Sequence, residues 1–274
     1  MIELKKRGGL MGLTGQSSGV NVLRESFNLD GEKGNPIIAL AGNPNTGKST
    51  VFNGLTGLKQ HTGNWPGKTV TQAQGYYNYL SQEYTVVDLP GTYSLLASSI
   101  EEQIARDFIC FAQPDATIVI VDATNLERNL NLVLQITELT DKVVLCLNLM
   151  DEAERKNIKI DIVGLANDLQ VPIVPTVARD GKGLNDLKEI VEKVVNNKIT
   201  LKPYKMKYSP KIEEKIEKLI EDLKNKFSRL KGKINLRWLA LRLLEGDRTV
   251  VQTLNNFYKY DEFEKKMEVT GKDE

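Results

Sequence analysis

The sequence has few of the residues that bind metals or cross-link chains: two cysteines and one histidine among 274 residues. Cys110 and Cys146 lie in apolar segments without CxxC spacing. This spacing excludes a disulfide framework and predicts buried, reduced thiols in a reducing compartment. His61 has no second histidine or CxxC pair near it, so a solvated or hydrogen-bonded loop residue is favoured over a metal ligand.

Long apolar runs and a surplus of one charge are also missing. No run reaches the ~18–20 apolar residues that span a bilayer, and the first residues lack the apolar centre of a signal peptide. Basic and acidic residues number 37 and 36, a net charge of +1, which argues against a protein whose main partner is a nucleic-acid backbone. We therefore expect a chain that is soluble in the cytoplasm and binds no nucleic acid.

Apolar runs of strand length do occur, and they alternate with helical patterns. This alternation predicts an α/β fold with a mostly parallel, six-stranded sheet and helices on both faces. Polar and apolar residues alternate over 71–80, which favours an edge position for that strand, and 57–70 is expected to be a loop. The expected strands are 36–42, 71–80, 83–88, 116–122, 142–148 and 171–175, and the expected helices are 48–55, 101–112, 126–140, 152–169 and 184–196.

Composition divides the chain into four parts. Residues 1–35 are rich in glycine, serine and charge, which predicts a flexible N-terminal extension with room for a short helix at 20–27. The α/β domain is expected over 36–197, and a small all-helical domain over 198–270, before a tail at 271–274. The helices expected in the second domain are 208–231, with Ile212, Ile216, Leu219, Ile220 and Leu223 on one apolar stripe, then 234–244 and 249–258.

A phosphate-binding loop lies between the first strand and its helix. The sequence GNPNTGKS fits GxxxxGK[ST] in the strand–helix context that the motif requires. Backbone N–H groups of such a loop converge on phosphates, and its glycines permit close approach. Lys48 adds a charge at the β- and γ-phosphates, and Ser49 offers a hydroxyl to Mg²⁺. The residues expected at the nucleotide are Gly42, Asn43, Pro44, Asn45, Thr46, Gly47, Lys48, Ser49 and Thr50.

The base is expected to be guanine. Asp151 ends an NxxD element after a strand, and its carboxylate can accept from the ring N1–H and amino group of guanine, a donor pair that adenine lacks. Such charge-assisted bonds contribute roughly 1.5–3 kcal/mol each. The Ala178 amide is expected at guanine O6. Leu149 replaces the usual stacking lysine, and Val177 a common serine. The base site is expected to contain Asn148, Leu149, Met150, Asp151, Thr176, Val177 and Ala178.

Two further segments are expected to sense the γ-phosphate. The sequence DLPG fits DxxG, so Asp88 would hold Mg²⁺ through water and the Gly91 amide would face the phosphate. Thr69, in the loop before the next strand, is the expected second Mg²⁺-sensing residue. Thr92 stands where many GTPases carry a glutamine that orients water, and it is too short for that role, which predicts slow hydrolysis. These segments add Gly67, Lys68, Thr69, Asp88, Leu89, Pro90 and Gly91 to the nucleotide site, with Ser49, Thr69 and Asp88 at Mg²⁺.

Four runs, GNPNTGKSTVFNGLTG, GNWPGKTV, DLPGTYSL and RWLALRLLEGD, resemble the cytosolic region of the bacterial ferrous iron transport protein B family over about 37–260. The resemblance implies that the helical domain acts like a nucleotide-dissociation inhibitor. It also implies that the tail leads to a polytopic ferrous iron permease in the same polypeptide, and that the region described by this sequence lies at the cytoplasmic face of the bacterial inner membrane. Association into a homo-oligomer is compatible with it.

The resemblance also assigns a role to Asn45. This residue matches a family asparagine associated with a K⁺ ion, which would offset charge that develops on the phosphates during hydrolysis. Together with the motifs, it makes Lys48, Asn45, Thr69 and Gly91 the expected catalytic groups, with GTP or GDP, Mg²⁺ and K⁺ as cofactors.

Two other functions share these motifs. A ribosome- or RNA-associated assembly GTPase would have a similar phosphate loop, but the balanced charge and the RWLALRLLEGD run speak against it. A GTP-dependent regulator with slow turnover is compatible with Thr92. Phosphate release at saturating GTP in K⁺ separates this regulator from an active switch.

Overall fold

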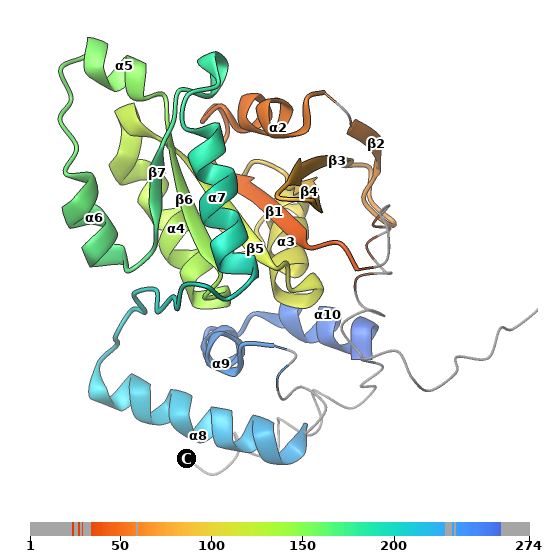
Figure 1. Cartoon of the computed structure of the whole chain (residues 1–274). Coiled ribbons are helices and arrows are strands. Elements are labelled where there is room, and N and C mark those ends of the chain that lie inside the picture. Colours follow the sequence, from red (N-terminus) through yellow and green to blue (C-terminus); the bar gives the residue numbers. More distant parts are fainter. Residues whose placement is uncertain are drawn as a thin grey trace, which may run out of the picture.

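The computed structural model describes residues 34–58, 60–227, 232 and 234–258, together with Arg24, Phe27 and Leu29. A seven-stranded sheet with the order β2-β3-β4-β1-β5-β6-β7 forms the centre of an α/β domain. Further helices lie beneath it in the view of Figure 1. The predictions for 1–35, for a helix at 20–27 and for a tail at 271–274 fall almost entirely outside the described residues.

The parallel part of the sheet follows the apolar runs of the sequence. All residues of β1 and β6 are buried, as expected for strands covered on both faces. The predicted α/β fold with a mostly parallel, doubly covered sheet is therefore confirmed, and its carboxyl edge is where such sheets bind ligands. The parallel strands are β1 (Ile37–Gly42), β4 (Gln82–Asp88), β5 (Ala116–Asp122), β6 (Val143–Asn148) and β7 (Ile173–Pro175).

The predicted number of six strands is wrong, because a strand lies inside the expected loop. β2 (Gln60–Asn64) pairs antiparallel with β3 (Thr71–Tyr79), which pairs antiparallel with β4. The prediction of an edge position for β3 is therefore wrong as well. The sequence QHTGN has no apolar alternation, and backbone pairing with β3 makes it a strand. His61 lies in this strand, exposed, with its ring 6.1 Å from that of Tyr76.

Helices cover both faces of the sheet, and alternate residues of β1 face each layer. Ile38 and Leu40 belong to one apolar cluster with α2 and α7, whereas Ala39 and Ala41 belong to the other, with α3 and α4. Buried Cys110 and Cys146 are free thiols; burial raises the pKa of both, to about 12 for Cys146. The helices are α2 (Lys48–Thr56), α3 (Ile100–Asp107) with a π-helical turn (Phe108–Ala112), α4 (Leu126–Leu139) and α7 (Leu184–Val195).

The single helix predicted over 152–169 is in fact two. α5 (Met150–Arg155) ends before Asn157, whose φ of 56° is left-handed and stops the helix. α6 (Ile162–Leu169) starts again at Asp161, whose side chain accepts a hydrogen bond from the Gly164 N–H at 2.9 Å and so caps the helix.

The three predicted C-terminal helices are present. α8 (Pro210–Lys226) begins with proline in its first turn, and α9 (Leu236–Leu244) and α10 (Arg248–Tyr258) follow. On the predicted stripe of α8, Ile216 and Leu223 are fully buried, whereas Ile212 is 40% exposed. None of the helices in the described part of the chain has the length and apolarity to cross a bilayer.

A buried ion network joins the helical domain to the α/β domain. The Arg106 side chain of α3 is fully buried, and its Nε donates to Asp107 Oδ1 at 2.9 Å. Its Nη1 donates to Thr249 Oγ1 at 2.8 Å and to Asp247 Oδ2 at 3.3 Å, both in the helical domain. One continuous apolar cluster also runs from α3 and α4 into α9 and α10. The two domains are therefore tightly packed on each other.

Candidate nucleotide-binding site

The loop between β1 and α2 has two positions, Gly42 and Gly47, where a side chain would clash with its neighbours. Gly47, at the N-cap of α2, has φ 82°, and a Cβ there would lie 2.4 Å from Asn148 Nδ2. A Cβ on Gly42 would lie 2.7 Å from the Ile120 carbonyl oxygen of β5. Thr46 Oγ1 donates to the Asn43 carbonyl at 3.0 Å inside the loop. The glycines of the motif are therefore required by close backbone and side-chain approach.

Two predicted phosphate- and Mg²⁺-binding groups lie together. Lys48 at the start of α2 donates through Nζ to Asp88 Oδ1 at the end of β4. Burial raises the pKa of the Asp88 carboxyl, and the Lys48 ammonium opposes that shift. Ser49, the other predicted Mg²⁺ ligand on α2, is exposed. The structure thus brings the lysine of the phosphate loop and the carboxylate of DxxG to one point at the carboxyl edge of the sheet.

The rest of DxxG lies against the phosphate loop. A Cβ on Gly91 would lie 3.5 Å from Pro44 Cα, and the Thr92 N–H donates to the Gly42 carbonyl at 3.3 Å. Leu89 is fully buried, and Thr92 is 5% exposed. The two motifs are therefore in direct contact, although 40 residues separate Lys48 from Asp88.

Asn148 connects the phosphate loop to the predicted base site. Its Nδ2 donates to the Thr46 carbonyl at 3.0 Å, and its Oδ1 accepts from the Ala178 N–H and from Thr176 Oγ1, both at 3.1 Å. The Ala178 amide, expected at guanine O6, thus donates to Asn148 in this structure. Its place beside the NxxD element is the one predicted, and its contact with the base stays a prediction.

Arg179 is a neighbour of the base site that the sequence reasoning missed. Its Nη2 lies 3.0 Å from Asp151 Oδ2, and its side chain is 68% exposed. The signal was available, since this arginine directly follows Ala178. An exposed ion pair contributes only about 0–1 kcal/mol, so guanine could displace Arg179 from Asp151 at little cost.

The turn that carries Thr69 and Gly67 packs against the end of α3. The Trp65 N–H donates to the Val70 carbonyl and the Lys68 N–H to the Trp65 carbonyl, both at 2.9 Å, which closes the turn. The Trp65 ring is buried, with its centre 5.5 Å from that of Phe108. Burial raises the pKa of the Asp107 carboxyl, and the Lys68 charge is one of those that oppose this rise. The contacts found for this turn are with its own backbone and with the α3 side of the sheet. The role of Thr69 at Mg²⁺ stays a prediction.

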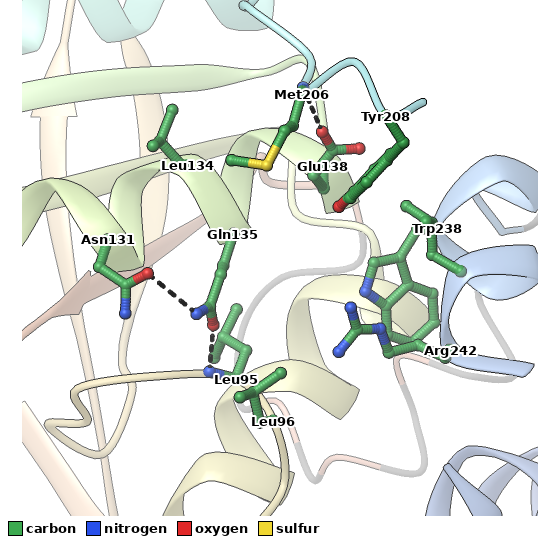
Figure 2. Close-up of a pocket in the computed structure, with 11 residues that line it drawn as sticks. Leu95, Leu96, Asn131, Leu134, Gln135, Glu138, Met206, Tyr208, Trp238 and Arg242 are labelled. Atoms are coloured by element: carbon green, nitrogen blue, oxygen red, sulfur yellow. Dashed lines mark hydrogen bonds between the residues drawn. The ribbon is translucent and has the colours of Figure 1, made fainter. Parts of the chain in front are cut away.

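The segment after Gly91 reaches the helical domain. Gln135 of α4 accepts a hydrogen bond through Oε1 from the Leu95 N–H at 2.6 Å, and its Nε2 donates to Asn131 (Figure 2). Leu95 and Leu96 line a cavity of about 210 Å³ whose other walls include Met206 and residues of α9. This cavity therefore has walls from the segment that follows DxxG and from the helical domain. The α9 residues that line it are Trp238, Leu241 and Arg242.

A mostly parallel sheet with this loop, DxxG and NxxD at the carboxyl edge of its parallel strands defines a P-loop GTPase domain that binds guanine nucleotide. The family model for ferrous iron transport protein B matches residues 36–191, and that for the FeoB cytosolic helical domain matches residues 208–272. The chain therefore belongs to the ferrous iron transport protein B (FeoB) family.

Curated relatives include the Fe(2+) transporters FeoB of Escherichia coli K12 and of Salmonella typhimurium LT2, 40% and 39% identical over 215 residues. The matches cover 77% of this chain and 27% of each relative, so the chain spans about a quarter of their length.

Solved structures agree with this membership. The cytosolic domain of T. maritima FeoB in a GDP form is 39% identical with a TM-score of 0.72, covering 84% of this chain and 86% of that one. The FeoB G-domain from Methanococcus jannaschii is 45% identical with a TM-score of 0.53, covering 59% and 98%. The fold expected from the resemblance is confirmed by these likenesses.

Proposed function

We propose that this chain is the GTP-hydrolysing switch region of a ferrous iron transporter and regulates or drives Fe(II) passage through a permease in the same polypeptide. The observation that carries the proposal is the bridge made by Asn148 between Thr46 of the phosphate loop and Ala178 of the base site. The curated relatives of this chain are named Fe(2+) transporters, and most of their length lies outside the matched region. We propose a location at the cytoplasmic face of the membrane, which the permease would cross.

The residues at the phosphate site fit Mg²⁺. Asp88 and Ser49 supply oxygen atoms, which Mg²⁺ prefers, and Lys48 already neutralises the buried carboxylate. Bound Mg²⁺ would neutralise charge on the β- and γ-phosphates. The positions of Thr69 and of the Gly91 amide would depend on whether the γ-phosphate is bound. Both lie on segments with contacts elsewhere, Thr69 towards α3 and Gly91 towards α4 and α9 through Leu95, so a change at the phosphate could reach the helical domain.

Hydrolysis by this chain alone is proposed to be slow. Thr92 follows DxxG, is buried, and has a short side chain and a backbone N–H bonded to Gly42. It therefore lacks the reach to orient an attacking water. Asn45 is exposed at the loop and can offer its amide oxygen to K⁺. A K⁺ ion there would supply positive charge beside the phosphates.

Phosphate release from GTP should be on the order of tenfold faster in KCl than in NaCl at equal ionic strength, since K⁺ would stabilise charge in the transition state. Asn45→Ala should remove that difference. Asn45→Gly tolerates the φ of 67° at this position and should remove it too. Exposed Asn78 on β3 is the control, because Asn78→Ala should keep the difference. Equal rates in both salts, or a difference that survives Asn45→Gly, would refute the role of K⁺.

A further inference from the structure

Three aromatic rings meet beside the turn that carries Thr69. Phe27 precedes the first strand and is buried at 7% exposure. Its ring centre lies 6.4 Å from that of Trp65 and 5.2 Å from that of Phe108, and all three pairs are edge-to-face. Aromatic pairs prefer this arrangement. Phe27 thus packs against both the turn and the end of α3.

A hydrogen bond from β3, which follows the turn, also holds the backbone of Phe27 in place. The Phe27 carbonyl accepts from Nε2 of Gln72 at 3.1 Å, and Gln72 of β3 is 3% exposed. Arg24 anchors the same segment, because its Nε and Nη2 donate to the Ala112 and Gln113 carbonyls at 3.0 and 2.7 Å. One short segment ahead of the domain therefore contacts residues on both sides of Thr69, namely Trp65 and Gln72.

We infer that Phe27 is a positioning residue for the Thr69 turn and acts through Trp65 and Gln72. The inference rests on the proposed function, because the position of the turn affects GTP binding only if Thr69 senses the γ-phosphate. The bonds that close the turn between Trp65 and Val70 couple Thr69 to the position of the indole ring. Removing the Phe27 ring takes away one of the two aromatic walls around Trp65 and lowers the population of the turn position that binds GTP. The apparent affinity for GTP falls with that population.

The affinity of GDP is the built-in reference, since GDP has no γ-phosphate for Thr69 to sense. Phe27→Ala should weaken a non-hydrolysable GTP analogue about tenfold, for a competent fraction reduced tenfold, and leave GDP within about twofold. Phe27→Leu, which refills part of the space, should fall between the two. Trp65 emission should also shift to longer wavelength in Phe27→Ala, because the indole gains contact with water.

The experiment uses the full chain with Mg²⁺ and compares both nucleotides on each variant. Phe227→Ala is the matched control, because Phe227 is 1% exposed but belongs to the helical domain; its ratio of GTP to GDP affinity should equal that of the wild type. If Phe27→Ala does not fold, Arg24→Met tests the same anchor from a half-buried position and should move the ratio in the same direction.

An unchanged ratio in Phe27→Ala, an equal loss of both nucleotides, or tighter binding of the GTP analogue would overturn the inference. These outcomes differ from failure of the proposed function. If the proposed function were wrong, the wild-type chain itself would not bind GTP. A wild type that binds and hydrolyses GTP, with a Phe27→Ala variant of the same ratio, would refute only the role of Phe27.

Discussion

Gly47→Ala should lower the affinity for GTP at least ~100-fold, whereas Gly57→Ala should change it less than about threefold. Both glycines flank α2 and have left-handed φ, 82° and 61°. Both substitutions therefore carry a similar backbone penalty of about 1–2 kcal/mol. The difference lies in the surroundings. A Cβ at Gly47 would lie 2.4 Å from Asn148 Nδ2, whereas one at Gly57 would have no atom of the described residues within 4 Å.

The clash at Gly47 should lower the affinity strongly, because the Asn148 side chain cannot move away without losing its hydrogen bonds. Its amide bonds Thr46 on one side and Ala178 on the other, so movement breaks the bridge between the phosphate loop and the base site. Titration with a fluorescent guanine nucleotide measures the affinity, and thermal unfolding without nucleotide checks that both variants fold. Similar affinities for the two variants would mean that Asn148 does not hold the loop in the binding form.

Arg106→Met should destabilise the chain by about 3–5 kcal/mol, the usual effect of removing one partner of a buried ion pair. Arg106 is fully buried, while Asp107 and Asp247 are 20% and 12% exposed at their side chains. Without the guanidinium, these two carboxylates would be charged at neutral pH, with little water around them and no positive partner at the position of Arg106. Urea unfolding measures the change. Arg155→Met is the control, since Arg155 is 62% exposed in its ion pair and should change stability by less than about 1 kcal/mol.

The deficit of Arg106→Met should depend on pH. Burial raises the pKa of the Asp107 carboxyl, and Arg106 opposes that rise. In the variant the folded-state pKa is higher still, so folding favours the protonated acid, and the deficit shrinks as the pH falls towards that pKa. Adding Asp107→Asn and Asp247→Asn should recover most of the loss at neutral pH. A loss as small as that of Arg155→Met would show that the network contributes little to the junction between the domains.

The features that could be predicted are those with a local cause. The strands β1 and β6 are apolar runs whose residues are all buried, so they stand out in the sequence. The phosphate loop, DxxG and NxxD are short motifs whose chemistry depends on adjacent residues. Their meeting at one edge then follows from the parallel topology, because the strands that precede them end on the same side.

The features that were missed depend on contacts between distant residues. β2 is polar and becomes a strand through pairing with β3. Arg106 forms a hydrogen bond with Asp247, which lies 141 residues further along the chain. Phe27 belongs to no recognisable motif, yet its ring packs edge-to-face against that of Trp65. The break between α5 and α6 rests on one left-handed residue, Asn157, which a helical pattern of apolar residues does not reveal.

The most direct test of the account is a comparison of GTP and ATP binding to the wild-type chain in Mg²⁺ and KCl. Two charge-assisted hydrogen bonds that the Asp151 carboxylate accepts from guanine, at roughly 1.5 kcal/mol or more each, predict at least ~100-fold tighter binding of GTP than of ATP. Equal affinities for the two nucleotides would contradict the base assignment and, with it, the proposal that this chain is a GTP-operated switch.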